Sequence, residues 1–156
     1  MIFVTVGTHT ASFNRLIRWM DEIANHLDEP VTAQIGVATY VPTHCEYFRF
    51  CTSEEIRDRI SRARVVVTHG GSTIREILSA GRPVVVVPRL KRFQEHLDDH
   101  QLELAQALAQ RGLIALALDA QSLETALRAP SPPAVQLPSP EPLIRALRRS
   151  IDRMDS

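Results

Sequence analysis

Short runs of β-branched residues, separated by segments with helical spacing, dominate the hydrophobic pattern of the chain. Residues 65–68 (VVVT) and 83–88 (PVVVVP) are compact apolar runs, which are typical of strands buried on both faces of a parallel sheet. Between them, the apolar residues of 72–80 recur every three or four positions, and Gly81 suits the end of a helix. This stretch therefore predicts a strand, a glycine-bearing loop, a helix and a second strand.

The same alternation extends over most of the chain. Further strands are expected at 2–6, 31–38, 46–51 and 113–118, and further helices at 12–27, after a cap at Thr52 or Ser53, at 95–110 and at 122–128. Strands that alternate with helices in this way indicate an α/β fold. We expect a single Rossmann-like domain with a doubly wound, mostly parallel sheet.

The pattern changes after residue 129. Six of the thirteen residues in 130–142 (PSPPAVQLPSPEP) are proline, which predicts an extended connector rather than a helix. In 143–154 apolar residues again recur at helical spacing, with arginines between them. Such a short amphipathic helix needs a docking surface, either on its own domain or on a partner. The chain is thus expected to divide into a domain at 1–129, a connector at 130–142 and a C-terminal amphipathic helix at 143–154.

Composition narrows the class of protein. A chain of 156 residues with 44% hydrophobic and 23% charged residues suits one soluble domain. Its 18 basic and 18 acidic residues cancel, so no overall charge recruits nucleic acid or an anionic membrane. Cys45 and Cys51 lack CxxC spacing, which favours reduced thiols in a cytoplasmic protein. No stretch approaches the roughly 20 apolar residues that span a bilayer, so we expect any membrane attachment to be indirect.

Two glycine-bearing segments are candidate binding loops. In a right-handed crossover the loops after parallel strands lie at the carboxyl edge of the sheet, where open α/β sheets bind ligands. One segment contains Gly70, Gly71, Ser72 and Thr73 and precedes a helix, so its backbone can approach an anion, most simply a phosphate. The other contains Gly7 and Thr8 directly after the first strand. A second phosphate-binding loop is therefore expected at the same edge.

Two side chains beside these loops remain open to two interpretations. His9 either faces the same cleft or makes a structural hydrogen bond. Glu76, one helical turn beyond Ser72 and Thr73, either accepts hydrogen bonds from a sugar diol or is a solvated helix carboxylate. The loop of Gly7 and Thr8 is not a GxGxxG motif. No acidic residue follows it at the position that would hold the ribose of a dinucleotide. An NAD(P)-binding Rossmann module is therefore a weaker alternative.

The segment KRFQEHLDDHQ offers a third candidate site. His96 and His100 are four residues apart on the expected helix, with Glu95 and Asp99 beside them, but the Glu of HExxH is missing. We therefore expect no metal there. Asp99, His100 and Gln101 are instead expected to present polar groups to neutral hydroxyls. Neither GxSxG nor a P-loop motif occurs, so acyl transfer and ATP hydrolysis lose support.

Taken together, VTVGTH, VVVTHGGSTIREILSAGRPVVVVP and EHLDDHQLELAQAL resemble the C-terminal-half domain of glycosyltransferase family 28 in its stand-alone small form. The resemblance covers residues 1 to about 118. That form includes catalytic subunits of two-component UDP-sugar transferases, both in dolichol-linked glycan assembly and in bacterial exopolysaccharide synthesis. GTH at 7–9 and EHLDDHQ at 95–101 are more similar to the bacterial group. The resemblance implies one half of a GT-B fold that holds a UDP-sugar without a metal or other cofactor.

Carried over by position, the resemblance assigns roles to individual residues. Gly7, Thr8, His9, Gly70, Gly71, Ser72 and Thr73 would border the donor diphosphate. Glu76 would bind the ribose and Phe50 would lie against uracil, while His100 and Gln101 would meet the donor sugar. No catalytic residue is assigned, because in two-domain relatives the missing acceptor-binding half supplies the base.

The resemblance also implies partners. We expect a membrane-anchored acceptor-binding subunit, a lipid-linked saccharide acceptor and a place on the cytoplasmic membrane face through that partner. The identity of the sugar and self-association into a homo-oligomer stay open. The alternative within this interpretation is a non-catalytic UDP-sugar-binding subunit that only enhances its partner.

Overall fold

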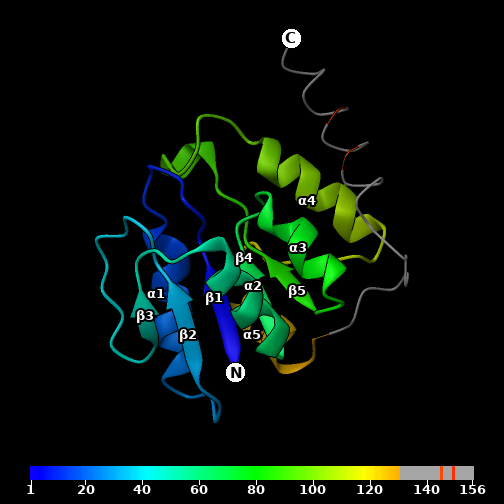
Figure 1. The fold of residues 1–156 in the computed structure, drawn as a ribbon. Helices are drawn as coiled ribbons and strands as arrows, with labels where there is room; N and C mark the ends of the chain where they lie inside the picture. The colour runs from blue at the N-terminus through cyan, green and yellow to red at the C-terminus, as the bar shows by residue number, and fades with distance from the viewer. Residues whose placement is uncertain (131–144, 146–148, 150–156) are drawn as a thin grey trace.

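The structure is a computed structural model that describes residues 1–130, 145 and 149. The expected connector at 130–142 lies outside the described residues except for Pro130. The expected helix at 143–154 lies outside them except for Arg145 and Arg149. The described domain is built around a six-stranded sheet in the order β3-β2-β1-β4-β5-β6 (Figure 1).

All strand pairs of this sheet are parallel, and the strands are short. They are β1 (Ile2–Thr5), β2 (Val31–Gln34), β3 (Glu46–Phe48), β4 (Val65–Thr68), β5 (Val84–Val86) and β6 (Ala115–Leu116). Ile2 pairs with Val31 on one side and with Val65 on the other, so β1 lies between the two halves of the sheet. The strand order reverses direction at β1 and β4, which makes their carboxyl ends the topological switch point. The expected doubly wound fold is thereby confirmed.

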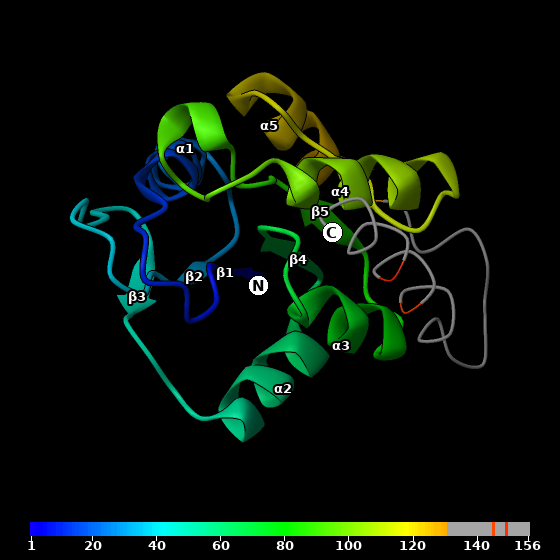
Figure 2. The ribbon, with the colours of Figure 1, turned by 90° about the horizontal axis from the view of Figure 1, so that it is seen from above.

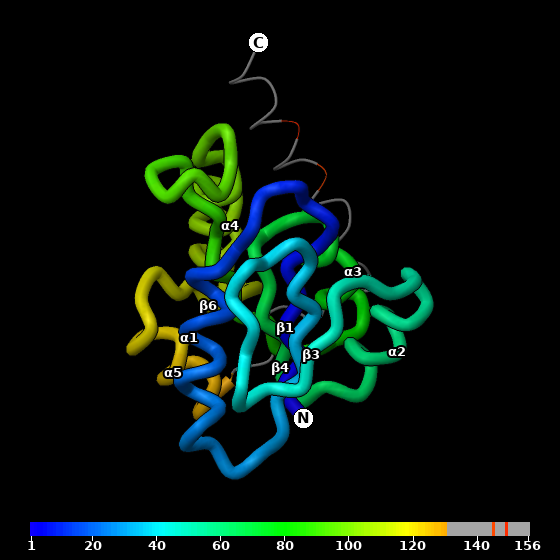
Figure 3. Tube along the Cα trace, turned by 90° about the vertical axis from the view of Figure 1, so that its left-hand side faces the viewer, coloured from blue at the N-terminus to red at the C-terminus, as the bar shows by residue number. Residues whose placement is uncertain are grey.

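Helices cover both faces of the sheet. They are α1 (Asn14–Ala24), α2 (Ser53–Arg62), α3 (Thr73–Ser79), α4 (His100–Gln110) and α5 (Ala120–Arg128), with a 3₁₀ turn η1 (Lys91–Phe93) before α4. Figures 2 and 3 show α1 and α5 on one side of the strands and α2 and α3 on the other. The buried residues of α1 and α5 share one core cluster, and those of α2, α3 and α4 share a second.

The valine runs explain why this sheet lies between two layers of helices. All residues of β1, β2, β4 and β5 are buried, and neighbours along β1 alternate between the two cores, with Val4 in one and Phe3 in the other. Each such side chain contributes about 1.5–3 kcal/mol when it leaves water. Strands that are buried on both faces read as continuous apolar runs, which is the pattern at 65–68 and 83–88.

Several expected elements are shorter in the structure, whereas the helix expected at 122–128 is longer because α5 begins at Ala120, and the helix expected at 95–110 begins later. The strand expected at 31–38 ends at Gln34, because Gly36 has a positive φ of 58° and turns the chain. Thr52 caps α2 in a capping box with Glu55, and Asp119 caps α5 in the same way with Ser122. The helix expected at 95–110 is wrong at its start, since α4 begins at His100.

Candidate functional site

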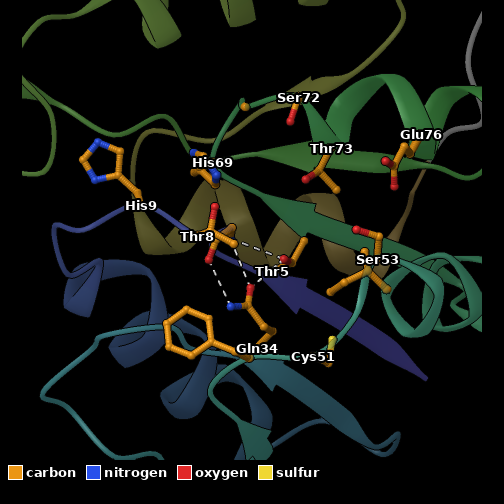
Figure 4. Close-up of a pocket in the computed structure, with 14 residues that line it drawn as sticks. Thr5, Thr8, His9, Gln34, Cys51, Ser53, His69, Ser72, Thr73 and Glu76 are labelled. Carbon is orange, nitrogen blue, oxygen red and sulfur yellow. Dashed lines mark hydrogen bonds between the residues drawn. The ribbon is translucent and has the colours of Figure 1, made fainter.

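A cavity of about 430 Å³ opens at the carboxyl edge of the sheet, beside the switch point (Figure 4). The last residues of β1 and β2 and the segments that follow β1, β3 and β4 contribute to it. Its lining residues are Thr5, Gly7, Thr8, His9, Gln34, Phe50, Cys51, Ser53, Ile56, His69, Gly71, Ser72, Thr73 and Glu76. No Lys or Arg occurs among them, so any anion held here must be bound by neutral donors.

The loop after β1 is fixed by one buried glutamine. The Gln34 side chain accepts hydrogen bonds from the Thr5 hydroxyl at 2.8 Å and from the Gly7 N–H at 3.1 Å. Its amide group also donates to the Gly7 carbonyl at 3.0 Å, and Figure 4 shows it beneath Thr5 and Thr8. Gly7 has a positive φ of 71°, which suits glycine. Because its N–H is already bonded, Gly7 shapes the loop and offers a ligand no donor.

The loop between β4 and α3 keeps its donors open. Gly70 has a positive φ of 97°, which turns the chain sharply after β4. Within the described part of the chain, no hydrogen bond is assigned to the backbone N–H groups of Gly71, Ser72 and Thr73. Ser72 and Thr73 also place hydroxyl groups in the cavity wall. This loop is therefore the part of the site best equipped to bind an anion.

His69 lies between these two loops and is only 6% exposed. Its Nδ1 is 3.2 Å from the Oε1 of Gln101, which in turn accepts the backbone N–H of Arg89 at 3.3 Å. Burial, followed by the nearby Arg89 guanidinium, lowers the pKa of His69 from 6.5 to about 3. The imidazole is therefore neutral at physiological pH, and it connects the loops that follow β1, β4 and β5.

A buried guanidinium supports the loop after β1 from below. Arg89 is fully buried and donates to the carbonyl oxygens of Val6 at 3.1 Å and of Ala11 at 3.0 Å. Burial lowers its pKa to about 10, so it remains cationic at neutral pH. Glu95 accepts two hydrogen bonds from Arg15, at 2.8 and 3.0 Å, in a bidentate pair. The two arginines and one glutamate leave a net charge of +1 behind the cavity.

His9 is held by its own loop. Its Nδ1 accepts the Ala11 N–H at 2.9 Å, and its ring centroid lies 5.0 Å from that of His96. Burial, followed by Arg89 and then His96, holds the pKa of His9 below its usual value. His9 thus makes the structural hydrogen bond and also lines the cavity. The two interpretations left open by the sequence both hold.

The histidine pair of the third candidate segment has a different geometry from the expected one. His96 lies before α4, so it does not share a helical face with His100. The expectation that both histidines lie on one helix is therefore wrong. Asp98 lies between them, with carboxylate oxygens 3.2 Å from the Nδ1 atom of each histidine. Among the described residues, no group of three or more possible metal ligands is found.

The structure brings together most of the site residues expected from the sequence. Gly7, Thr8, His9, Phe50, Gly71, Ser72, Thr73 and Glu76 line the cavity. Gly70, His100 and Gln101 do not; Gln101 lies behind His69, and His100 is the first residue of α4. The sequence assigned no role in the binding site to Thr5, Gln34, Cys51, Ser53, Ile56 or His69. A polar residue inside an apolar strand was the available signal for Gln34.

Comparison with known families identifies the domain. The sequence profile of the glycosyltransferase family 28 C-terminal domain matches residues 1–139. The chain belongs to this family. A search of curated proteins finds no match. Among its described residues, no helix is long and apolar enough to cross a membrane.

Solved structures agree on the fold of this family 28 domain. The kitacinnamycin glycotransferase is 23% identical with a TM-score of 0.63, and the match covers 97% of this chain but 39% of that one. The solution structure of ALG13 is 16% identical with a TM-score of 0.60, and the match covers 96% and 94% of the two chains. UDP-GlcNAc 2-epimerase from Neisseria meningitidis, bound to UDP-GlcNAc, is 13% identical with a TM-score of 0.58. The match covers 81% of this chain and 34% of the epimerase. The family 28 domain thus spans about two fifths of the kitacinnamycin enzyme and nearly the length of ALG13.

Proposed function

We propose that this family 28 domain binds a UDP-sugar in the carboxyl-edge cavity and donates the sugar as the catalytic subunit of a bipartite glycosyltransferase. One observation carries the proposal: both glycine-bearing loops, Phe50 and Glu76 line a single cavity. A diphosphate, a base and a ribose each find a chemically matching group there. The family match over residues 1–139 supports the same conclusion.

The diphosphate would bind along the loop after β4. The unpaired N–H groups of residues 71–73 and the hydroxyls of Thr8, Ser72 and Thr73 can donate to its oxygens. The cation of Arg89 lies behind the loop after β1 and adds a fixed positive charge at short range. These groups would also stabilise the negative charge that develops on the departing UDP.

The nucleoside would lie along the part of the cavity wall that Glu76 and Phe50 form. The Glu76 carboxylate can accept hydrogen bonds from the two ribose hydroxyls, and the exposed ring of Phe50 offers a flat apolar surface for uracil. The structurally similar Neisseria meningitidis epimerase is bound to UDP-GlcNAc, which supports a uridine nucleotide as the ligand class. The donor sugar would then extend toward α4, where His100 and Gln101 begin the helix.

The reaction would be a direct, inverting displacement at the anomeric carbon, with UDP as the leaving group. With Glu76 assigned to the ribose, the lining residues include no other carboxylate, and burial lowers the pKa of both lining imidazoles, His9 and His69, which makes them poor bases for an acceptor hydroxyl. We therefore assign the base to a second polypeptide, which would supply the acceptor site. That partner would be membrane-anchored and its acceptor a lipid-linked oligosaccharide, as in exopolysaccharide or glycan assembly.

Exposed apolar residues support a partner at the same edge. Leu97 is 88% exposed, and Val37, Val41, Phe50 and Phe93 are each between 42% and 53% exposed. Phe50 lines the cavity, and Leu97 lines an adjoining hollow together with His9, so these two side chains lie beside its opening. Large apolar side chains at one rim are typical of an interaction surface. A complementary half that docks there would exclude water from the bound donor.

Calorimetric titration of the whole chain tests the ligand. UDP is expected to bind and NAD is not. Glu76→Ala should weaken UDP binding by about tenfold to a hundredfold, because hydrogen bonds to a charged group contribute about 1.5–3 kcal/mol. Glu103→Ala is the matched control, since Glu103 is an exposed carboxylate of α4 outside the cavity, and it should leave binding unchanged. Tight NAD binding without a response to UDP would overturn the proposal.

A non-catalytic enhancer is distinguished by transfer rather than by binding. In a complex with the purified partner and at a sub-saturating UDP-sugar concentration, Glu76→Ala should lower transfer of radiolabelled sugar about tenfold to a hundredfold while the two chains still co-purify. Unchanged transfer by that variant would favour the enhancer.

A further inference from the structure

The position of His69 explains two glycines at once. A Cβ atom at Gly7 would lie 2.8 Å from the Nε2 of His69, and a Cβ at Gly71 would lie 2.7 Å from its Cε1. The imidazole therefore fills the space between the two loops with its Nε2–Cε1 edge. That edge adjoins Gly7 and Gly71, which line the cavity together with His69, although His69 itself is nine-tenths buried.

Hydrogen bonding assigns the proton on this ring. The Arg89 backbone N–H can only donate, so the Gln101 atom 3.3 Å away is the carbonyl oxygen Oε1. The same oxygen lies 3.2 Å from the Nδ1 of His69, and an oxygen that accepts requires a proton on Nδ1. The charged and titratable groups that act on the ring are Arg89, His9 and His96, and none is an anion. The ring is neutral with its single proton on Nδ1, so Nε2 carries a bare lone pair.

His9 has the opposite arrangement. Its Nδ1 accepts the Ala11 N–H, so the proton of the neutral ring is on Nε2. The same edge of the sheet thus carries one imidazole whose Nε2 accepts and one whose Nε2 donates. No hydrogen bond to the Nε2 of His69 is found among residues 1–130, so this acceptor lacks a protein partner.

We propose that His69 determines how the ligand is oriented in the cavity: its Nε2 accepts a hydrogen bond from a ligand hydroxyl and keeps phosphate oxygens away from that position. A lone pair repels a phosphate oxygen, which has no proton to share, whereas a hydroxyl supplies the missing donor. The diphosphate is then confined to the N–H groups of residues 71–73 and the Nε2–H of His9. This inference rests on the proposed function in taking the ligand to be a UDP-sugar.

The first experiment concerns the free protein and needs no ligand. A long-range ¹H–¹⁵N spectrum of the imidazoles of the whole chain, assigned with His69→Asn and His9→Asn, should show His69 protonated on Nδ1 and His9 protonated on Nε2 at pH 7. A His69 ring protonated on Nε2, or on both nitrogens, overturns the inference even if UDP-sugars bind.

The second experiment measures the ligand contact. UDP-glucose is the probe, because its diphosphate does not titrate between pH 6 and 8, and binding is followed in buffers of different ionisation enthalpy. We expect no proton uptake at His69 on binding, since a hydroxyl does not raise the basicity of Nε2 as an anion does. Uptake of close to one proton that disappears in His69→Asn would place a phosphate oxygen on Nε2 and overturn the inference.

Two variants separate the contact from a structural role. His69→Asn keeps an N–H for Gln101 but is too short to place an acceptor at the position of Nε2, and it should bind UDP-glucose about tenfold more weakly. An equal loss for UDP identifies a ribose hydroxyl, and a loss confined to UDP-glucose identifies a hydroxyl of the sugar. Gln101→Glu keeps the ring and gives Nδ1 an anionic partner that favours protonation. The affinity of the Gln101→Glu variant for UDP-glucose should fall or stay constant as the pH drops from 8 to 6. Tighter binding at the lower pH would overturn the inference.

The outcomes for the proposed function and for this inference are distinguishable. If the unmodified chain binds neither UDP nor UDP-glucose, the proposed function fails and the ligand contact fails with it, whereas the spectrum still decides the tautomer. If UDP-glucose binds with proton uptake at His69, the proposed function stands and only the inference fails.

Discussion

At the scale of single residues, the site requires glycine at two positions for a different physical reason from the one expected from the sequence. The sequence suggested that they let a ligand approach the backbone, and Gly7 and Gly71 do line the cavity. However, a side chain at either position would first meet His69, at less than 3 Å. The glycines therefore accommodate a buried imidazole as well as a ligand.

This packing predicts that Gly71 and His69 are energetically coupled. Gly71→Ala should lower the free energy of unfolding by about 1–3 kcal/mol, because the added methyl group overpacks a buried site. The same substitution in a His69→Ala background should have a much smaller effect, since the clashing ring is absent. Urea unfolding of the four proteins of this double-mutant cycle measures the coupling.

Gly81→Ala provides the control for that cycle. Gly81 has a positive φ of 70° but no atom within 4 Å of an added Cβ. Its substitution should lower the unfolding free energy by about 1–2 kcal/mol through backbone strain alone, and equally with or without His69. A Gly71 effect that does not depend on His69 would contradict the packing argument.

At the scale of elements, the segment before α4 shows a tertiary contact that overrides local pattern. Residues 95–110 have helical spacing, yet Gln94 has a positive φ of 58° and the helix begins only at His100. Glu95 is buried, where it pairs with Arg15 of α1 and accepts the Leu90 N–H at 3.1 Å. A helix that began at Glu95 would lose these contacts, so the ion pair sets the start of α4.

Removal of this carboxylate should therefore be strongly destabilising. Glu95→Ala is expected to lower the free energy of unfolding by about 3–5 kcal/mol, because it leaves Arg15 and the Leu90 N–H without their buried partner. Asp58→Ala, which breaks the exposed pair with Arg62 on α2, should change it by less than about 0.5 kcal/mol. Denaturant unfolding at neutral pH compares the two, and similar effects would show that the buried pair has no special role.

At the scale of the whole molecule, the site occupies the point where the sheet reverses its winding. Parallel strands that are buried on both faces leave only their ends for chemistry, so the polar residues gather at the carboxyl edge. The chain folds as one half of the architecture seen in the longer glycosyltransferase of kitacinnamycin, of which it spans 39%.

The stability of the whole domain should depend on pH through His69. The pKa of this group is about 3 in the folded state and near 6.5 when it is exposed. The unfolded state therefore binds more protons, and the stability due to neutral His69 is fully present above pH 6.5 and is lost as pH falls toward 3. Between pH 6 and 4 the unfolding free energy should fall by about 1.4 kcal/mol per pH unit from this group.

Urea unfolding at several pH values checks this expectation. His69→Asn removes the titrating group and should flatten the dependence between pH 6 and 4. Asp21 should contribute to the pH dependence of stability only at lower pH. Burial raises the pKa of Asp21, but hydrogen bonds from the His44 N–H and the Tyr40 hydroxyl outweigh burial, so the pKa lies below its usual range. An equally steep decline in the His69→Asn variant would contradict the assignment.

Part of the site could be predicted because it depends on neighbours along the chain. Glycines, hydroxyls and Glu76 follow the ends of recognisable strands, and parallel strands necessarily bring those ends to one edge. Gln34 and His69 could not be assigned in this way. Gln34 acts on Thr5, 29 residues away, and His69 acts through Gln101, 32 residues away, so each contact exists only after the sheet has formed.

The sequence by itself determined the fold class, the winding of the sheet and the edge that carries the site. Hydrophobic periodicity and strand–helix alternation are local properties of the chain, so they can be recognised before any tertiary contact is known. Tertiary structure alone decided where α4 begins, which glycines adjoin an imidazole and where that imidazole holds its proton. Those features depend on buried polar groups whose partners come from distant segments. Burial makes an unpaired donor, acceptor or charge costly, and only the folded chain shows which partners are within reach.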